Sequence, residues 1–227
     1  MKKTTFDTWL VNGNITIFCG SHADEFKKDI LSSSLLGELV ASQKSANPEV
    51  NWPIYTETVQ KIGWMVNSRG NQRLDFDNRN LLTLVGQCAG SDLPKDEQQA
   101  LADAWAELTK LQPDSPAITA IIDKLQRSAT VSESSNISAV STGAMLTIIR
   151  NDKTVVTLQV TFETTHCLDS DLLDQPVLNA IGNDRTNSWQ LSSLLDGRHY
   201  NQVRADVLKK LGRNIETKLL HITAASG

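Results

Sequence analysis

The sequence lacks the short motifs by which many functions are recognised. It contains no G-x-G-x-x-G, G-x-x-x-x-G-K-[ST], H-E-x-x-H, G-x-S-x-G or C-x-x-C segment. The usual signatures of dinucleotide binding, P-loop phosphate binding, zinc proteolysis, a hydrolase nucleophile and thiol redox chemistry are therefore missing. An enzyme is not excluded by this, but any catalytic role must be argued from individual residues.

Cysteine and basic runs are also scarce. The chain has three widely spaced cysteines, Cys19, Cys88 and Cys167, and an odd number of them argues against a disulfide framework and for a reducing compartment. The net charge is −4, from 22 basic and 26 acidic residues, and no basic stripe is present. We therefore expect a cytoplasmic protein with no nucleic-acid partner.

Long apolar runs are absent as well. No stretch of 18 apolar residues occurs, so no membrane-spanning helix is expected. The start Met1-Lys2-Lys3 is basic, but Asp7 and Asn12-Gly13-Asn14 interrupt the apolar stretch that a secretory signal needs. With 40% hydrophobic and 21% charged residues, the 227-residue chain is predicted to form one soluble domain, residues 1–227.

Residues 6–19 have the pattern of a β-hairpin. Asn12-Gly13 lies between two apolar-rich runs and favours the type I′ turn, in which both central residues need positive φ. A two-residue loop places Leu10 opposite Ile15 and Phe6 opposite Cys19, so one face of the hairpin is apolar.

Residues 139–165 predict a second hairpin, and apolar side chains occupy even-numbered positions on both of its strands. Both sets share a face only if the numbers of opposed residues sum to an even number. We therefore predict an odd-length loop, Asn151-Asp152-Lys153, with Leu146 opposite Leu158.

Apolar residues at steps of three and four predict helices in several other segments. One covers about 21–45, with Ser21 as N-cap, and an αα-hairpin covers 94–129, with Ser115-Pro116 starting its second helix. Pro48 and Pro53 predict a loop. Shorter helices are expected over 56–66, 81–89, 189–195 and 199–211, and the tail 215–224 fits a strand or a helix, of which we favour the strand.

These elements predict an α+β fold. Its antiparallel sheet is built from the two hairpins, with a C-terminal strand where 215–224 is extended, giving four or five strands. Helices cover the apolar face of this sheet.

Four residues are candidates for a catalytic site. His166 and Cys167 form the densest cluster of reactive side chains, but neighbours on an extended segment point to opposite faces, so His166 does not easily activate Cys167. If the two hairpins join one sheet with those ends together, Cys19, His22, His166 and Cys167 meet at one edge as a thiol or zinc site. The alternative is packing, because free cysteines are usually buried. No cofactor and no metal site is predicted.

Three functions remain open. The first is a non-enzymatic soluble protein that acts through its surface as an assembly or interaction component, with a protein partner or self-association; Trp9, Trp52, Trp64 and Trp189 would suit such an interface if exposed. The second is a membrane-acting, pore-forming or toxin-like protein that uses the amphipathic 139–165 hairpin. The third is an enzyme with a Cys/His site.

Overall fold

The computed structural model describes residues 5–75, 93–132, 139–164, 168 and 185–222. Its strands are β1 (Phe6–Val11), β2 (Asn14–Cys19), β3 (Trp64–Asp75), β4 (Thr130–Ser132), β5 (Ala139–Ile149), β6 (Val155–Thr164), β7 (Arg185–Leu195) and β8 (Leu219–Ile222). Its helices are α1 (Asp24–Lys44), α2 (Pro48–Lys61), α4 (Lys95–Leu108), α5 (Pro116–Arg127), α6 (Gly197–Leu211) and α7 (Asn214–Lys218).

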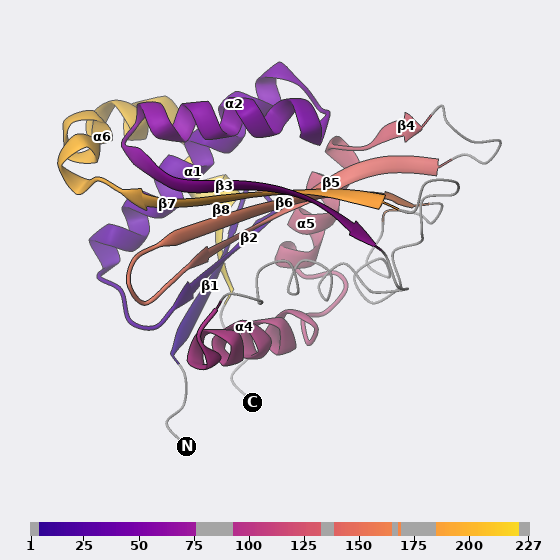
Figure 1. Cartoon of the computed structure of the whole chain (residues 1–227), viewed down its shortest axis with the longest axis horizontal. Helices are drawn as coiled ribbons and strands as arrows, with labels where there is room; N and C mark the ends of the chain where they lie inside the picture. Colours follow the sequence, from indigo (N-terminus) through magenta and orange to yellow (C-terminus); the bar gives the residue numbers. More distant parts are fainter. Residues whose placement is uncertain (1–4, 76–92, 133–138, 165–167, 169–184, 223–227) are drawn as a thin grey trace.

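The described strands form one sheet, and the chain is α+β (Figure 1). Seven strands follow the order β3-β7-β6-β5-β2-β1-β8, and the short β4 pairs with β5 off this path. The sheet is mostly antiparallel but mixed, because β2 and β5 run parallel, with Ile15 opposite Leu146 and Phe18 opposite Ile149. The expectation of a purely antiparallel sheet of four or five strands is therefore corrected.

The first hairpin has the pairing that its turn residues indicate. Leu10 lies opposite Ile15 and Phe6 opposite Cys19. Asn12 and Gly13 have φ of 52° and 87°, the positive values that a type I′ turn requires.

The second hairpin also has an odd-length loop. Leu146 lies opposite Leu158. Lys153 N donates to Arg150 O over 2.9 Å, and Arg150 N donates to Thr154 O over 2.8 Å. Lys153 has a φ of 70°, which closes a three-residue loop over 151–153.

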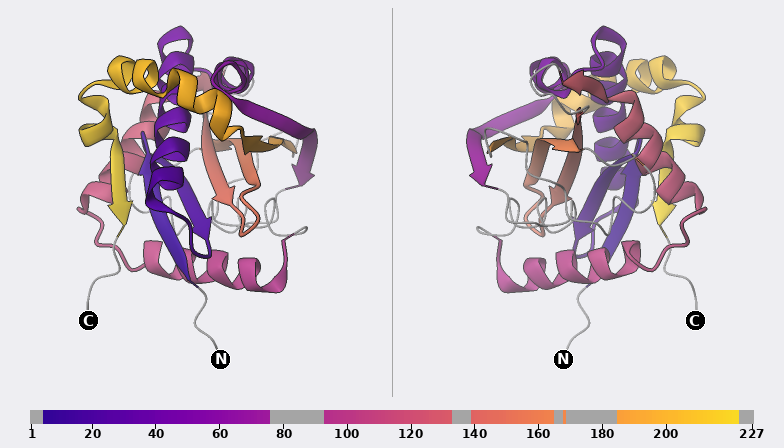
Figure 2. Two further views of the ribbon diagram at one scale, coloured as in Figure 1. Left: turned by 90° about the vertical axis from the view of Figure 1, so that its left-hand side faces the viewer. Right: turned by 90° about the vertical axis from the view of Figure 1, so that its right-hand side faces the viewer.

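Helices cover both faces of the sheet, not one face as expected. α4 and α5 pack on the face that carries Leu10, Ile17, Leu146 and Leu158. α1, α2 and α6 pack on the opposite face, and Figures 1 and 2 show these three helices on one side of the sheet and α4 on the other. Side chains of successive strand residues point to opposite faces of the sheet, and each face is covered by helices. Successive strand residues are therefore apolar. The result is a three-layer arrangement with two cores.

Helix α1 is buried on all sides through its middle, which explains a sequence that contains three consecutive serines. Residues 29–38 are all buried, including Ser32, Ser33 and Ser34. Each serine meets a different aromatic residue. The contacts are Ser32 Oγ with Tyr200 OH at 2.7 Å, Trp64 Nε1 donating to Ser33 Oγ at 2.9 Å, and Ser34 Oγ with Tyr55 OH at 3.1 Å. Because consecutive helical residues point about 100° apart, one tripeptide orients α6, β3 and α2 around α1.

The two helices expected over 94–129 are present as α4 and α5, but they run in different directions and do not lie side by side as an αα-hairpin (Figure 2). The Ser115 side chain accepts a hydrogen bond from Ile118 N, with Pro116 in the first turn of α5. Helix α6 ends at Gly212, whose φ is 51°. These helix boundaries follow from local capping, which the sequence shows directly.

Several local predictions are wrong. α1 begins at Asp24 with Ala23 as N-cap and no side-chain cap, so Ser21 is not the cap. Pro48 and Pro53 lie in α2, where Asn47 is the cap and Pro48 occupies the first turn. The segment 189–195 belongs to strand β7. The tail begins in α7, but the favoured C-terminal strand is confirmed for Leu219–Ile222, which joins the sheet as β8. The helix expected over 81–89 lies outside the described residues.

Candidate functional site

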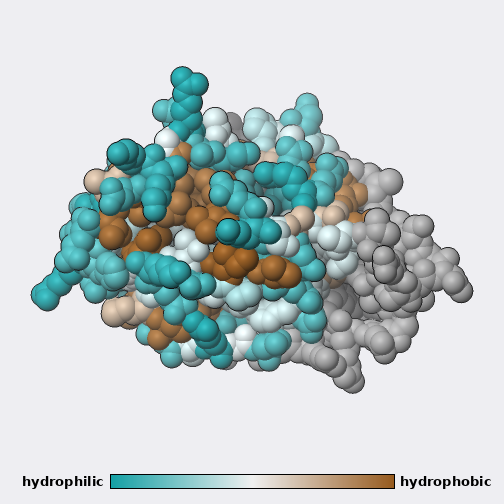
Figure 3. Space-filling view, turned by 90° about the horizontal axis from the view of Figure 1, so that it is seen from above, coloured by the Kyte–Doolittle hydropathy of each residue, from teal (hydrophilic) through white to brown (hydrophobic). Residues whose placement is uncertain are grey.

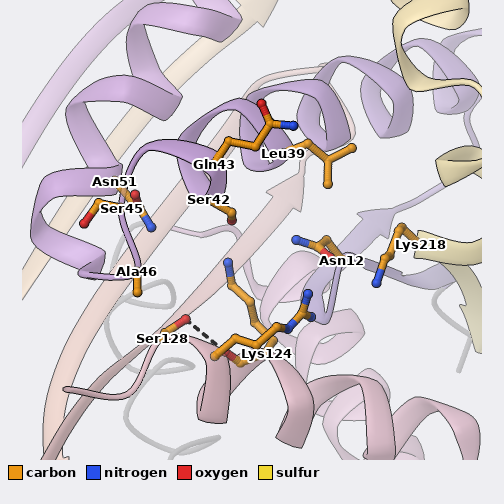
Figure 4. Close-up of a pocket in the computed structure, with 11 residues that line it drawn as sticks. Asn12, Leu39, Ser42, Gln43, Ser45, Ala46, Asn51, Lys124, Ser128 and Lys218 are labelled. Atoms are coloured by element: carbon orange, nitrogen blue, oxygen red, sulfur yellow. Dashed lines mark hydrogen bonds between the residues drawn. The ribbon is translucent and has the colours of Figure 1, made fainter. Parts of the chain in front are cut away.

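A pocket lies beyond the turn end of the first hairpin (Figure 4). Its volume is about 360 Å³. Four separate parts of the chain line it: the β1–β2 turn, the segment from the end of α1 to the start of α2, the end of α5, and α7. The lining residues are Asn12, Leu39, Ser42, Gln43, Ser45, Ala46, Asn51, Lys124, Arg127, Ser128 and Lys218.

The β1–β2 turn is the fixed wall of this pocket. A Cβ on Gly13 would lie 2.4 Å from Ala120 O and 2.6 Å from Lys124 Cβ, so only glycine lets α5 approach the turn this closely. On the other side, Asn12 N donates to Lys218 O over 2.8 Å and holds the end of α7 against the turn. The turn therefore positions both cationic helix ends.

Two asparagines of the lining hold a buried, unpartnered amide oxygen. Asn12 is 3% exposed as a residue, and its Oδ1 has no hydrogen-bond partner among the described residues. Asn51 Oδ1, from α2, is buried without a described partner in the same way. Buried amide oxygens are almost always paired, because an unpaired one is destabilising by about 1–3 kcal/mol. Both residues line the pocket through other atoms, because these two oxygens have almost no accessible surface and a ligand in the pocket does not reach them (Figure 4).

Three cationic side chains belong to the pocket lining, and they differ in their surroundings. Lys124 Nζ contacts Glu38 Oε2 at 2.7 Å, with both side chains at least 88% buried, so this cation is compensated. Arg127 and Lys218 form no ion pair with a described residue. Arg127 Nε donates to the neutral backbone oxygen of Asp123 at 3.0 Å. The pocket thus has two uncompensated positive charges at its rim.

Cys19 is an unsuitable nucleophile where the structure places it. The residue is fully buried at the end of β2. Burial raises the pKa of its thiol to about 12, with further contributions from the charges of Glu97 and Asp96, so the side chain stays a thiol near neutral pH. Cys19 packs in the core between the sheet and α4.

His22 contacts the backbone of Cys19 and not its sulfur. Nε2 donates to Cys19 O over 2.9 Å. The ring also lies against Phe18, with centroids 5.8 Å apart, and stacks on Phe26 at 5.5 Å. These contacts fix His22 as the residue that joins the end of β2 to α1.

His166 and Cys167 lie outside the described residues, so their predicted meeting with Cys19 and His22 stays a prediction. The described strands give it no support. Phe18, next to Cys19, pairs with Ile149, whereas Thr164 pairs with Val140, nine residues away along β5. That separation is about 30 Å at the rise of a strand. The strands that lead to the two pairs therefore end at opposite ends of the sheet.

Local sequence patterns gave little indication of the pocket. Most of its residues are common polar types from four separate parts of the chain, and the sequence around Asn12 indicates only a turn. Within the described residues, no group of three or more His, Cys, Asp or Glu side chains is arranged to hold a metal ion. None of the described helices has the length and apolar character needed to cross a membrane.

Comparison with known proteins assigns no family. No family model matches the chain, and no curated protein matches it. Among solved structures, one described as the structure of the Evf virulence factor is similar with a TM-score of 0.32 and 7% identity, over 92% of this chain and 82% of that one. A likeness at this level assigns neither fold nor function.

Proposed function

We propose that the protein is a non-enzymatic binding protein that holds a small polar molecule in the pocket beyond the β1–β2 turn. The observation that carries this proposal is the pocket lining, in which amide, hydroxyl and cationic side chains from four parts of the chain surround a space of about 360 Å³. A polar ligand could pair with several of these side chains at once.

The pocket also has the composition of a binding site without the groups of a catalytic one. It combines amide, hydroxyl and cationic side chains, and the described residues that line it include no histidine, cysteine or carboxylate. General acid–base or nucleophilic catalysis uses such groups, or a lysine of lowered pKa. Lys124, the buried lysine here, is ion-paired with Glu38.

Blocking the pocket tests this function. Ser42 is exposed and lines the pocket, so Ser42→Trp fills the space without entering either core. Gln202→Trp, at an exposed position on α6 outside the pocket, is the matched control. Thermal unfolding is measured against a panel of small hydroxylated molecules of different charge. At least one should raise the melting temperature of the wild type and of Gln202→Trp but not of Ser42→Trp. Equal responses of all three proteins would contradict the proposal.

A second candidate is the function first indicated by the sequence, contact with a partner protein or with a second copy of the chain. β3 is at the edge of the sheet and bears no second strand among the described residues. Its residues 67–71 are exposed, and Met65 is 51% exposed. An extended segment could add to such an edge by main-chain hydrogen bonds. Of the four tryptophans considered, Trp64 is buried and does not contribute to this surface.

The helical face adds apolar surface to this second candidate. Figure 3 shows hydrophobic side chains between hydrophilic ones on the side of α1, α2 and α6. Val50 on α2 is 49% exposed and Leu208 on α6 is 41% exposed. Light-scattering mass across a dilution series is the test, with Met65→Lys expected to weaken association through β3. A monomeric mass at all concentrations, together with no captured partner, would refute this candidate.

The two remaining alternatives, a membrane-acting protein and a Cys/His enzyme, have less support. β5 and β6 lie inside the sheet between β2 and β7, and residues 155–162 are buried. Insertion of this hairpin into a membrane would require both cores to open. Dye release from liposomes is the corresponding test of insertion. A Cys/His activity would have to involve His166 and Cys167 apart from Cys19, whose thiol is buried.

A further inference from the structure

The charges around the pocket restrict what it can bind. Lys124 and Glu38 neutralise each other across 2.7 Å. Arg127, exposed at the end of α5, and Lys218, half-buried at the end of α7, remain without an ion-pair partner among the described residues. Asp123, one turn before Arg127, presents its backbone oxygen to the guanidinium and forms no described ion pair with it. The charges of the lining residues Lys124, Arg127 and Lys218 and of Glu38 sum to +2, whereas the negatively charged Asp123 is not among the described lining residues.

The uncharged part of the lining favours hydroxyl groups. Ser42, Gln43, Ser45 and Ser128 add donors and acceptors to the two asparagine amides, and Leu39 and Ala46 are the apolar members of the lining. The Ser128 hydroxyl donates to Lys124 O over 2.9 Å, which leaves its oxygen able to accept (Figure 4). A hydroxylated ligand can form hydrogen bonds with these lining side chains, whereas a hydrocarbon ligand would leave them without a partner in the pocket.

We propose that the ligand is a small hydroxylated dianion, either a phosphate monoester or a hydroxy-dicarboxylate, held between Arg127 and Lys218 with its hydroxyl toward Ser42 and Ser45. This inference rests on the proposed function and adds the chemical class of the ligand. Arg127 and Lys218 come from different elements, so a dianion joins the end of α5 to the end of α7 across the turn. A dianion neutralises the positive charges of Arg127 and Lys218. A singly charged molecule neutralises one of them, and a neutral molecule neither.

Calorimetric titration with four probes tests the charge requirement. The probes are glycerol 3-phosphate, malate, lactate and glycerol, at constant ionic strength and a slightly alkaline pH, where a phosphate monoester carries nearly two charges. One dianion or both should bind at least about tenfold more tightly than lactate, because hydrogen bonds to charged groups contribute strongly. The two dianions distinguish phosphate from dicarboxylate. Binding should weaken as salt is added, since the cations are partly exposed.

Charge-neutral variants locate the binding. Arg127→Gln and Lys218→Gln should each weaken the dianion by about tenfold and leave glycerol unchanged. Lys209→Gln, an exposed lysine on α6 outside the pocket, is the charge-matched control and should not alter binding.

The outcomes separate this inference from the proposed function. Glycerol binding that matches the dianions, blocked by Ser42→Trp and unaffected by Arg127→Gln, would refute the dianion and preserve the binding function. Dianion binding that survives Ser42→Trp, and that weakens in Lys209→Gln as much as in Arg127→Gln and Lys218→Gln, would place the anion outside the pocket and refute the inference. No binding by any of the four probes at millimolar concentration would refute the inference, and the thermal-unfolding panel with Ser42→Trp would decide the proposed function separately.

Discussion

Replacing Lys124 by methionine is expected to lower the free energy of unfolding by about 3 kcal/mol. Lys124 Nζ and Glu38 Oε2 are 2.7 Å apart, and the two side chains are 12% and 7% exposed. Loss of the ammonium leaves the Glu38 carboxylate buried without its partner, a change that usually destabilises by about 3–5 kcal/mol. We expect the lower end of this range of destabilisation because Lys124 borders the pocket, where water can reach it. Methionine keeps the packing of the lysine stem, so the effect isolates the charge.

A double-mutant cycle decides whether the charge is the cause. Glu38→Met removes the carboxylate, and the double variant Lys124→Met/Glu38→Met buries no unpaired charge. The double variant should be more stable than Lys124→Met alone, with a coupling energy of about 2 kcal/mol. Urea unfolding measures all four proteins. Lys61→Met, which breaks the exposed Glu57–Lys61 pair, is the control and should leave stability nearly unchanged. Additive losses in the cycle would show that the pair does not join α1 to α5.

Three further changes have defined outcomes. Ser33→Ala leaves Trp64 Nε1 as a buried donor without its 2.9 Å acceptor and should lower the free energy of unfolding by about 1–3 kcal/mol, part of which Trp64→Phe restores; a neutral Ser33→Ala contradicts the role given to the serines. Gly13→Ala combines a φ of 87° with a Cβ 2.4 Å from a backbone oxygen of α5 and should destabilise by at least about 2 kcal/mol in the same assay, whereas Gly197→Ala, with open space around its Cβ, should be tolerated. Burial raises the pKa of Asp7, but hydrogen bonds from Lys27, Trp9 and His221 and the charge of Lys27 outweigh it and hold this pKa below its ordinary 3.8. The stability that Asp7 contributes is therefore present above pH 3.8 and is lost as the pH falls through the lowered pKa, so unfolding curves of wild type and Asp7→Asn should converge in acid, and a constant difference would refute this assignment.

The features that the sequence predicted correctly are those encoded by neighbouring residues. Asn12-Gly13 indicates its own turn, and the alternation around Leu146 and Leu158 restricts the second loop to an odd length. Ser115 and Gly212 likewise mark helix ends that capping chemistry specifies. Each of these signals acts within a few residues, so no knowledge of the distant chain is needed.

The features that were missed depend on distant segments. The parallel pairing of Ile15 with Leu146 joins strands separated by four described helices, and no local pattern specifies it. Without that pairing, the second helical layer and the burial of both sheet faces could not be inferred. The sequence predicts a loop at Pro53, but this residue lies within α2, where packing of the helix against α1 outweighs the lost backbone hydrogen bond.

The candidate site was missed for a related reason. A polar pocket requires that unrelated side chains converge, and Asn12, Lys124 and Lys218 are unremarkable in their own segments. Cys19 and His22 drew attention because their side chains are reactive in general. In the fold, burial of Cys19 and the hydrogen bond from His22 to its carbonyl oxygen account for both residues.

The pairing of β8 with β1 has a consequence for the protein as it is synthesised. Thr8 lies opposite Ile222, about 210 residues later in the chain. At ribosomal rates of about 5–20 residues per second, β1 leaves the ribosome roughly 10 to 40 s before its outer partner does. During that interval the nascent chain presents an open strand edge next to apolar side chains, the kind of surface that chaperones shield and that aggregation exploits.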